Sequence, residues 1–348
     1  MEKERFRSYQ PHSLSNGSVK PTIYLLSQRS ANIEALFNTR NILHAKHFRE
    51  TRKMADRPRF GPAGVPHIFR VMGAKLPDVP TLLRQEELDA FEYQAVRWGQ
   101  KPQVKQEDAD SLGREAQRND VQLSLHGSYF INLAGADGVV EASKRRLIAC
   151  ATAAAWMKAY VVVFHPGYYG KMGKIYSFKR CTEALKDVVK SMESLGIREV
   201  KLGPETMGKH SQLGSLEEVL TLCEEVEHIH LVIDWGHLHA RGAGKIAKTA
   251  DFRAIVEDVE RRLGTEFARN MHCHFSKIEF TNRGERRHHV LDETKYGPNF
   301  EGLAEVIADF KLRPVIICET PLLDVDARKM RRILQQTIID KSLTGNQE

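Results

Sequence analysis

Residues 231–240 read LVIDWGHLHA, and the fold can be predicted outward from this short stretch. An apolar run ends in a carboxylate, Asp234, and two imidazoles, His237 and His239, follow within five residues. A buried strand that ends in an acidic residue and continues into a histidine-bearing loop can present oxygen and nitrogen ligands to one metal ion. The question is whether other strands of this chain end in the same way.

From Arg59 onward, short apolar runs alternate with longer stretches in which apolar residues recur every three or four positions. The predicted strands are Arg59 to Gly64, Ala90 to Ala95, Gln122 to His126, Tyr160 to His165, Glu199 to Glu205, His230 to Asp234, Asn270 to Ser276 and Pro314 to Glu319. The clearest predicted helices are Asp137 to Lys158, Ser177 to Leu195, Ser215 to Val226 and Asp251 to Leu263. Eight strands alternating with helices predict a (β/α)8 TIM barrel. A doubly wound open sheet is the main alternative, but no glycine-rich nucleotide fingerprint follows the first strand.

Residues 1–53 differ in composition from the rest of the chain. They hold ten Lys or Arg against four Glu, a net charge of +6 out of the +7 of all 348 residues. The basic balance therefore says little about what the main domain binds. The segment has no sustained apolar period, so it is interpreted as a disordered tail, a transit-like leader or sequence upstream of a true start at Met54. We expect a single barrel domain over residues 54–348, preceded by this extension.

Composition also narrows the class of protein. Hydrophobic residues make up 41% of the chain, yet no apolar run approaches the ~20 residues that a membrane span needs. Five cysteines are scattered without a C-x-x-C pair, and an odd number gives no disulfide framework. We expect a cytoplasmic protein without a membrane partner.

Polar residues close several of the predicted strands. Five predicted strands end in such a residue: His126, His165, Glu205, Asp234 and Glu319. A sixth, the predicted strand Asn270 to Ser276, contains both His272 and His274. The carboxyl ends of all strands of a barrel open onto one face, so these side chains should converge there. Carboxylates and imidazoles without a thiolate cluster suit Zn²⁺, Mn²⁺ or Fe²⁺. Two carboxylates able to bridge suggest more than one ion, as in sites that activate water for phosphoryl transfer.

The same segments resemble a known family. The strings HGSYFINL at His126, FHPG at His165, LGPETMGK around Glu205, IDWGH at Asp234, MHCHFSK around His272, RRHH at Arg286 and CET at Glu319 resemble, in order and spacing, the motifs of endonuclease IV, and RFGPAG at Arg59 is similar to the usual start of its archaeal-type branch. The resemblance runs from about Arg59 to about residue 340. It implies a zinc-dependent barrel with up to three ions that cuts double-stranded DNA 5′ to abasic sites and leaves a 3′-hydroxyl in base excision repair. We expect a monomer.

The resemblance also implies roles for individual residues. Glu205 matches the carboxylate that bridges two ions and Glu319 the last carboxylate, and both are expected to be catalytic. The implied metal ligands are His126, His165, Glu205, Asp234, His237, His272 and Glu319. His272 is favoured over His274, which is interpreted as an outer-sphere or phosphate contact.

One position departs from the family pattern. Where the family has Asp-x-His, this chain has Arg286, Arg287 and His288. Arginine is always protonated and has no acceptor atom, so Arg286 cannot bind a cation. Glu285 is the candidate for the missing acidic ligand, with His288 as its partner. The alternative is that the third ion is absent and Arg286 holds the scissile phosphate through two parallel hydrogen bonds.

DNA contacts are implied more loosely. Tyr129 and Phe130 match side chains that the family inserts into the groove, and Arg97 lies where a second inserting loop would be. Arg286 belongs to a basic cluster suited to phosphates. Two other functions remain open: a xylose-isomerase-like sugar isomerase or epimerase, which needs fewer histidines, and a non-catalytic nucleic-acid-binding barrel.

Overall fold

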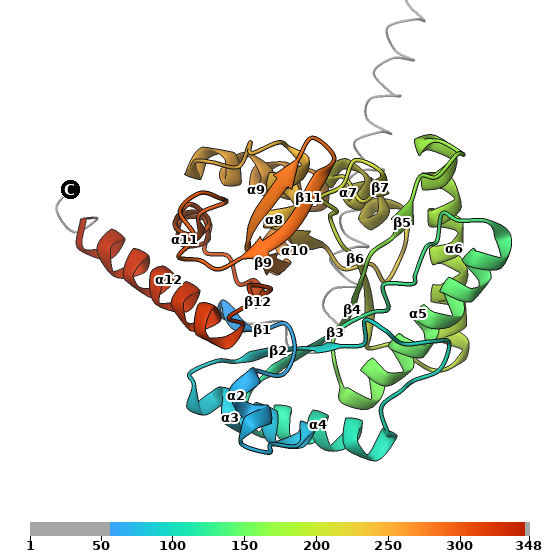
Figure 1. Ribbon diagram of the computed structural model, residues 1–348, viewed down its shortest axis with the longest axis horizontal. Helices are drawn as coiled ribbons and strands as arrows, with labels where there is room; N and C mark the ends of the chain where they lie inside the picture. The colour runs from blue at the N-terminus through green and yellow to red at the C-terminus, as the bar shows by residue number, and fades with distance from the viewer. Residues whose placement is uncertain (1–55, 345–348) are drawn as a thin grey trace, which may run out of the picture. The chain divides into compact units, whose positions relative to one another are not determined.

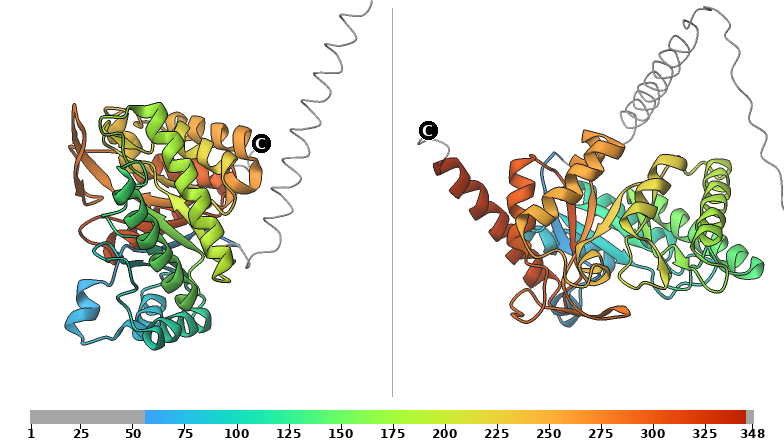
Figure 2. Two further views of the ribbon diagram at one scale, coloured as in Figure 1. Left: turned by 90° about the vertical axis from the view of Figure 1, so that its right-hand side faces the viewer. Right: turned by 90° about the horizontal axis from the view of Figure 1, so that it is seen from above.

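The computed structural model describes residues 56–344 and shows a barrel of parallel strands surrounded by helices (Figures 1 and 2). The extension predicted for residues 1–53 lies outside the described residues, so it stays a prediction. Among residues 56–344, no helix is both long and apolar enough to cross a bilayer.

Eight parallel strands form the barrel, and they correspond one to one to the eight predicted strands. They are β1 (Arg59–Pro62), β2 (Ala90–Gln94), β3 (Gln122–His126), β4 (Val161–Phe164), β6 (Lys201–Pro204), β8 (Val232–Asp234), β9 (His272–Phe275) and β12 (Val315–Cys318). Their cores are short runs of buried apolar residues such as VVVF in β4 and VIIC in β12. Strands covered on both faces need such continuous apolar runs.

Backbone pairing closes these strands into one ring. The strands pair in two groups, β1-β12-β9-β8 and β2-β3-β4-β6, each parallel throughout. Parallel bridges join the groups at both seams, Ala63 to Glu92 and Glu205 to Val232. The amide of Gly64 donates to the Glu92 carbonyl oxygen at 2.9 Å at the first seam. The predicted (β/α)8 barrel is therefore confirmed.

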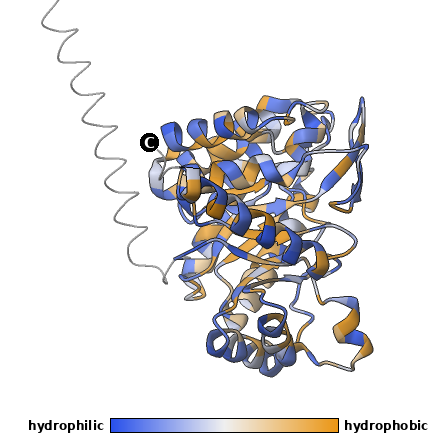
Figure 3. Cartoon of the chain, turned by 90° about the vertical axis from the view of Figure 1, so that its left-hand side faces the viewer, coloured by the Kyte–Doolittle hydropathy of each residue, from blue (hydrophilic) through white to orange (hydrophobic). Residues whose placement is uncertain are grey.

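Helices cover the outside of this ring (Figure 1). They are α2 (His67–Val71), the 3-10 turn η1 (Leu76–Asp78), α3 (Val79–Gln85), α4 (Gln106–Arg118), α5 (Asp137–Met157), α6 (Lys174–Ser194), α7 (Leu216–Glu225), α9 (Thr249–Leu263), α10 (Thr265–Arg269), α11 (Phe300–Asp309) and α12 (Asp324–Thr344). Figure 3 shows that the helices carry both hydrophobic and hydrophilic residues, whereas the strands are mainly hydrophobic. The core lies between strands and helices and includes Phe91, Phe164, Phe252, Phe275 and Phe300, all buried.

Helix ends follow local chemistry. α7 begins after Ser215, whose hydroxyl accepts from the amide of Glu218 while the Glu218 carboxylate accepts from the amide of Ser215. α5 ends at Lys158, which adopts a left-handed conformation with φ 58°. α6 begins three residues earlier than predicted, after Gly173, whose φ of 77° suits glycine.

Three structures were not predicted from the sequence. The predicted loop after Asp234 is the short helix α8 (Trp235–Arg241). The predicted loop after the seventh strand is an antiparallel hairpin of β10 (Lys277–Thr281) and β11 (Gly284–His289). A small antiparallel pair, β5 (Gly167–Tyr168) and β7 (Gln212–Leu213), joins two further loops above the strands. Polar strand-end loops carry no strong periodic signal, which is why these elements were missed.

Candidate metal centre

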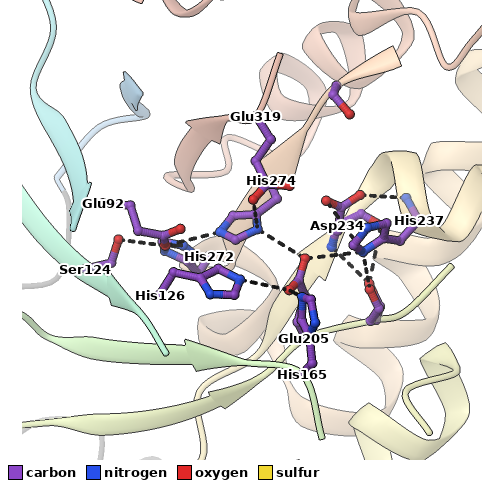
Figure 4. A network of polar contacts seen from close by, with 12 residues as sticks. Glu92, Ser124, His126, His165, Glu205, Asp234, His237, His272, His274 and Glu319 are labelled. Atoms are coloured by element: carbon purple, nitrogen blue, oxygen red, sulfur yellow. Dashed lines mark hydrogen bonds and ion pairs between the residues drawn. The ribbon is translucent and has the colours of Figure 1, made fainter. Parts of the chain in front are cut away.

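Six polar side chains from different strands meet where the barrel strands end (Figure 4). His126 and Asp234 are the last residues of β3 and β8, and His274 lies in β9. His165, Glu205 and Glu319 follow directly after β4, β6 and β12. The sequence predicted this convergence, because all these strand ends open on one face.

Glu205 stands at the centre of the group and is completely buried. Its Oε2 atom lies 3.1 Å from Nε2 of His165 and 3.5 Å from Nε2 of His126. Its Oε1 atom lies 3.1 Å from Nδ1 of His274 and 3.3 Å from Nδ1 of His237. Each oxygen of one carboxylate therefore faces its own pair of imidazoles, as expected of a carboxylate shared between two cation positions.

Two sets of ligand atoms share Glu205. One consists of His126, Glu205 and His274, and the other of Glu205, Asp234, His274 and Glu319; within each set the atoms lie within 4.8 Å of one another. The second set holds three carboxylates, and Nδ1 of His274 lies 3.3 Å from Oε1 of Glu319. Three carboxylates this close repel one another unless positive charge lies between them.

The electrostatics of the two glutamates show this repulsion. Burial raises the pKa of Glu205, but the charge of His274 and the close Nε2 atoms of His126 and His165 outweigh burial, so the pKa lies well below its usual range. Burial, reinforced by the negative Glu205 and Asp234, raises the pKa of Glu319 to about 8, although His274 opposes the shift. Glu319 is therefore the carboxylate that lacks sufficient positive charge nearby.

Buried oxygens without hydrogen-bond partners test whether cations fit this site. Within the described part of the chain, Glu205 Oε2, Asp234 Oδ2 and Glu285 Oε2 are buried and accept no hydrogen bond. An ionised oxygen in that state carries a large desolvation penalty. Divalent cations bound by oxygen and imidazole ligands would remove the penalty, so the residues present fit a metal centre.

Backbone carbonyls orient two of the histidines. Nδ1 of His126 lies 2.9 Å from the Gly127 carbonyl oxygen, and Nδ1 of His237 lies 3.0 Å from that of Thr206. A carbonyl oxygen only accepts, so each Nδ1 carries the proton and Nε2 keeps its lone pair. Nε2 of His126 faces Glu205, and Nε2 of His237 faces Glu285 at 3.4 Å.

Helix α8 explains why the stretch after Asp234 holds two histidines. Oδ1 of Asp234 accepts from the amide of His237 at 2.6 Å and caps the helix. This cap fixes the side chains of Asp234 and His237 at the site. His239 takes no part in the centre: its Nδ1 lies 2.9 Å from the Ile246 carbonyl oxygen, and its ring packs against Phe280.

The two histidines of β9 occupy positions that differ from the sequence expectation. His274, expected to be an outer contact, lies between Glu205 and Glu319. His272, expected to be the ligand, pairs instead with Glu92 and Tyr160, deeper in the barrel. Sequence reasoning missed Glu92, a fully buried carboxylate in β2. Its signal was an acidic residue inside the apolar strand AFEYQ.

Hairpin β10–β11 brings a further group to the centre. Its register pairs Glu279 with Arg287 and Phe280 with Glu285, so Arg286 is the extra residue of a β-bulge. Glu285 and His288 then lie opposite Phe280 and Ile278, which are two residues apart on β10 and so share one face. Without the bulge, Glu285 and His288, which are three residues apart, would lie on opposite faces of the hairpin. Nδ1 of His288 lies 2.8 Å from the Ser276 hydroxyl, and its ring lies 5.7 Å from that of His237.

Two glycines allow this approach. An added Cβ at Gly208 would lie 2.1 Å from Oε2 of Glu285, and Gly284 has φ +102° where an added Cβ would lie 2.3 Å from the Gly208 carbonyl oxygen. Arg286 points elsewhere: its side chain is 67% exposed and one of its nitrogens lies 2.7 Å from Oε1 of Glu279. The structure thus brings Glu285, and not Arg286, next to His237.

Aromatic side chains stand at the edge of the centre. Tyr129 is half exposed, stacks on the ring of His165 at 5.2 Å and meets His126 edge on at 5.4 Å. Phe130 is 60% exposed, and the Arg146 guanidinium lies 5.9 Å from its ring centre. The amide of Tyr129 donates to the Val96 carbonyl oxygen at 2.9 Å, so the loop of the exposed Arg97 lies beside this rim.

The parallel barrel and the candidate metal centre at the carboxyl ends of its strands together define a class of proteins. Comparison with known protein families gives the same class. Residues 81–337 match the family described as "Xylose isomerase-like TIM barrel", and the chain belongs to this family. It is 36% identical to an uncharacterized protein of Methanocaldococcus jannaschii over 77% of this chain and 93% of that one. It is 26% identical to a "Probable endonuclease 4" of Nitratidesulfovibrio vulgaris over 71% of this chain and 88% of that one.

Solved structures agree on the fold. Endonuclease IV from Thermus thermophilus superposes with a TM-score of 0.62 at 21% identity, over 80% of this chain and all of that one. A D-tagatose 3-epimerase-like protein superposes with a TM-score of 0.57 at 19% identity, over 77% of this chain and 97% of that one. The names of these two neighbours describe different activities, and their likeness to this chain shows the fold alone.

Proposed function

We propose that this protein is a metal-dependent DNA-repair endonuclease of the endonuclease IV type, of the archaeal-type branch. Its reaction is hydrolysis of the phosphodiester bond 5′ to an abasic site, which leaves a 3′-hydroxyl. The observation that carries the proposal is the placement of His237, Glu285 and His288 beside the Glu205 carboxylate. A single-ion sugar epimerase has no need of this additional group.

The proposed ligands fall into three neighbouring sets. We assign His126, His165 and Glu205 to one ion, because both imidazoles face Oε2 of Glu205. Glu205, Asp234, His274 and Glu319 would hold a second. His237, Glu285 and His288 would hold a third. Zn²⁺ suits this donor set, and Mn²⁺ or Fe²⁺ are alternatives. Bound there, the ions supply an activated water and neutralise charge on the phosphate oxygens.

The chain's own residues have separate tasks in this proposal. Glu205 would be shared by two ions, because its Oε2 atom faces His126 and His165 and its Oε1 atom faces His274. Glu319 completes the ligand set of the second ion, because its Oε1 atom lies 3.3 Å from Nδ1 of His274. Both touch the reacting centre and are proposed as catalytic residues.

Substrate binding is assigned to the rim. An abasic nucleotide must leave the duplex to reach a buried centre, and extrusion costs little because no base pair is broken. Tyr129 and Phe130 are exposed enough to fill the space left in the stack, with Arg97 beside them. Arg286 lies outside the ligand group and is proposed to contact a phosphate. The partner is double-stranded DNA containing abasic sites, and we expect a monomer to bind it.

The test is incision of a duplex that carries one tetrahydrofuran abasic analogue, which cannot undergo elimination. We expect a cut 5′ to the analogue in the presence of Zn²⁺ or Mn²⁺, no cut in excess EDTA, and a product that a polymerase can extend. The same duplex with an intact base pair is the control substrate. An uncut analogue after incubation with either metal would refute the proposal.

One observation favours a second candidate. Glu205, Asp234, His274 and Glu319 would by themselves hold a single ion in a sugar epimerase, and a D-tagatose 3-epimerase-like protein shares the fold. That function predicts one ion per chain and interconversion of ketohexoses such as D-tagatose, with the abasic duplex left intact. Counting ions in the native protein by mass spectrometry separates one from three.

A further inference from the structure

Glu92 carries a charge that the proposed metal ligands do not account for. It lies in β2, its side chain faces the barrel interior, and it is fully buried. Its Oε2 atom accepts from the Ser124 hydroxyl at 3.0 Å and lies 3.2 Å from Nε2 of His272 and from Nε2 of His274. Its Oε1 atom accepts from the Gln94 amide at 3.2 Å. Figure 4 shows this carboxylate on the side of His274 away from Glu205.

These contacts fix the protons on both histidines. An ionised carboxylate only accepts hydrogen bonds, so Nε2 of His272 and Nε2 of His274 must both carry a proton. Nδ1 of His272 then accepts from the Tyr160 hydroxyl at 2.6 Å. Both ring nitrogens of His272 are thereby occupied. A directed chain of hydrogen bonds runs from Tyr160 through His272 to Glu92, and His274 donates to the same carboxylate.

The opposite side of His274 faces the metal centre. Its Nδ1 atom lies 3.1 Å from Oε1 of Glu205 and 3.3 Å from Oε1 of Glu319. A histidine whose Nε2–H is held by a carboxylate keeps its Nδ1 lone pair for a cation. Such a carboxylate also makes the imidazole a stronger ligand, and losing such a partner typically weakens metal binding about 10- to 100-fold.

The ligand atoms of Glu92, His272 and His274 also lie within 4.8 Å of one another, as in the sets that contain Glu205. Among the described residues, the buried oxygens without a hydrogen-bond partner include Glu205 Oε2 and Asp234 Oδ2, which face the centre. No side-chain atom of Glu92, His272 or His274 is in that state. The Glu92 carboxylate already accepts from both histidines and from Ser124, so we assign these three residues to hydrogen bonding and not to an ion of their own.

We propose that Glu92 is a positioning residue, which fixes the tautomer of His274 so that this histidine binds the ion shared with Glu205 and Glu319 through Nδ1. The inference rests on the metal centre proposed above, but it does not depend on which reaction that centre performs. His272 donates to Glu92 and accepts from the Tyr160 hydroxyl, and neither residue belongs to a proposed ligand set.

The experiment compares the metal affinities of full-length variants by competition with a chromogenic zinc chelator. Glu92→Gln keeps the shape and removes the charge, and we expect the ion held by His274 to bind about 10- to 100-fold more weakly. Tyr160→Phe removes one donor behind Glu92, and its affinity should lie between that of the wild type and that of Glu92→Gln. Glu218→Gln, the same change at a carboxylate that caps α7 and belongs to no proposed ligand set, is the matched control and should stay close to the wild type.

A thermal unfolding midpoint of the metal-free protein separates a positioning role from a structural one. We expect Glu92→Gln and Glu218→Gln to have similar midpoints while only Glu92→Gln loses affinity. Unchanged affinity in Glu92→Gln, or complete loss of one ion with the others held as tightly as before, would overturn the inference; the second result would mean that Glu92 binds its own ion. If Glu92→Gln loses metal affinity as expected, and the metal-loaded wild type leaves abasic DNA intact, only the proposed function fails. A wild type that binds no divalent ion would overturn both.

Discussion

Oε2 of Glu285 lies 3.4 Å from Nε2 of His237, although the two residues come from a hairpin strand and from helix α8. His237 donates its Nδ1 proton to the Thr206 carbonyl, so the nitrogen that faces Glu285 is the one with a lone pair. A carboxylate oxygen without a hydrogen-bond partner faces this nitrogen. Burial lowers the pKa of His237, but the charges of Asp234 and Glu285 outweigh burial and raise it well above its usual range, so positive charge is favoured between the two atoms. A metal ion would supply that charge in place of a proton.

The first prediction concerns this pair. Glu285→Ala should lower the number of bound ions by one and reduce abasic-site incision, because it removes the only carboxylate oxygen that faces His237 Nε2 in the described contacts. Arg286→Ala should leave the ion count unchanged, because its side chain contacts Glu279 and solvent. Native mass spectrometry after dialysis provides the count. An equal count in both variants, with activity lost only in Arg286→Ala, would mean that the third ion is absent and that Arg286 holds the scissile phosphate in its place.

The second prediction concerns Glu205. Glu205→Gln preserves the side-chain shape but removes the charge that offsets two cations, so incision should fall by about two orders of magnitude or more. The fold should persist, because the apolar layers between strands and helices are unchanged, and circular dichroism checks this. Glu218→Gln is the control and should keep its activity. Glu218 is a half-buried carboxylate that caps α7 and accepts from the Tyr169 hydroxyl, and it belongs to no proposed ligand set. Near-normal cutting by Glu205→Gln would remove Glu205 from the centre of the mechanism.

The third prediction concerns the rim. Phe130→Ala should weaken binding of the abasic duplex about tenfold, since stacking of one base on an aromatic ring is worth roughly 1 to 3 kcal/mol. The ion count should not change, because no proposed ligand contacts Phe130. Leu343→Ala, an equally exposed apolar residue on α12, is the matched control and should bind DNA like the wild type. Equal binding by all three proteins, measured by fluorescence anisotropy, would rule out stacking by Phe130.

The fourth prediction concerns acid stability. Burial, with help from the nearby charges of His272 and Lys201, lowers the pKa of His230 to about 3. The folded protein therefore binds this proton less readily than the unfolded chain, whose histidines titrate near 6.5, and stability should fall as pH drops below that value. The loss should be about 1.4 kcal/mol per pH unit between pH 6.5 and pH 3.

His230→Gln has no proton to gain there, so its unfolding midpoint should depend less steeply on pH than that of the wild type. The exposed His67 gives the control: His67→Gln should retain the wild-type slope. Parallel slopes for the wild type and His230→Gln would show that His230 does not stay neutral in the folded state.

The barrel strands could be predicted from sequence because each is a short apolar run between polar segments, and burial on both faces requires that pattern. The convergence of His126, Glu205 and Asp234 followed from parallel strand direction alone. Glu92 could not be assigned in this way, because its partners lie on β3 and β9 and are distant in the chain.

The choice between His272 and His274 also lay beyond the sequence. Both point to the same side of β9, and only the depth of each in the barrel decides which one meets Glu205. The hairpin is a similar case. A bulge has no local sequence signal strong enough to reveal that Arg286 is the extra residue.

The bulge at Arg286 bears on how such centres are found by spacing. Along an extended strand, an insertion of one residue exchanges inside and outside for everything on one side of it, so it should separate two ligands that worked as a pair. Here the added residue, Arg286, is left out of the pairing between the two strands. Glu285 and His288 therefore face the same side of the hairpin, as residues two apart on a regular strand would. A fixed-interval motif would count this chain as having lost a ligand, whereas counting paired positions on the partner strand would recover it.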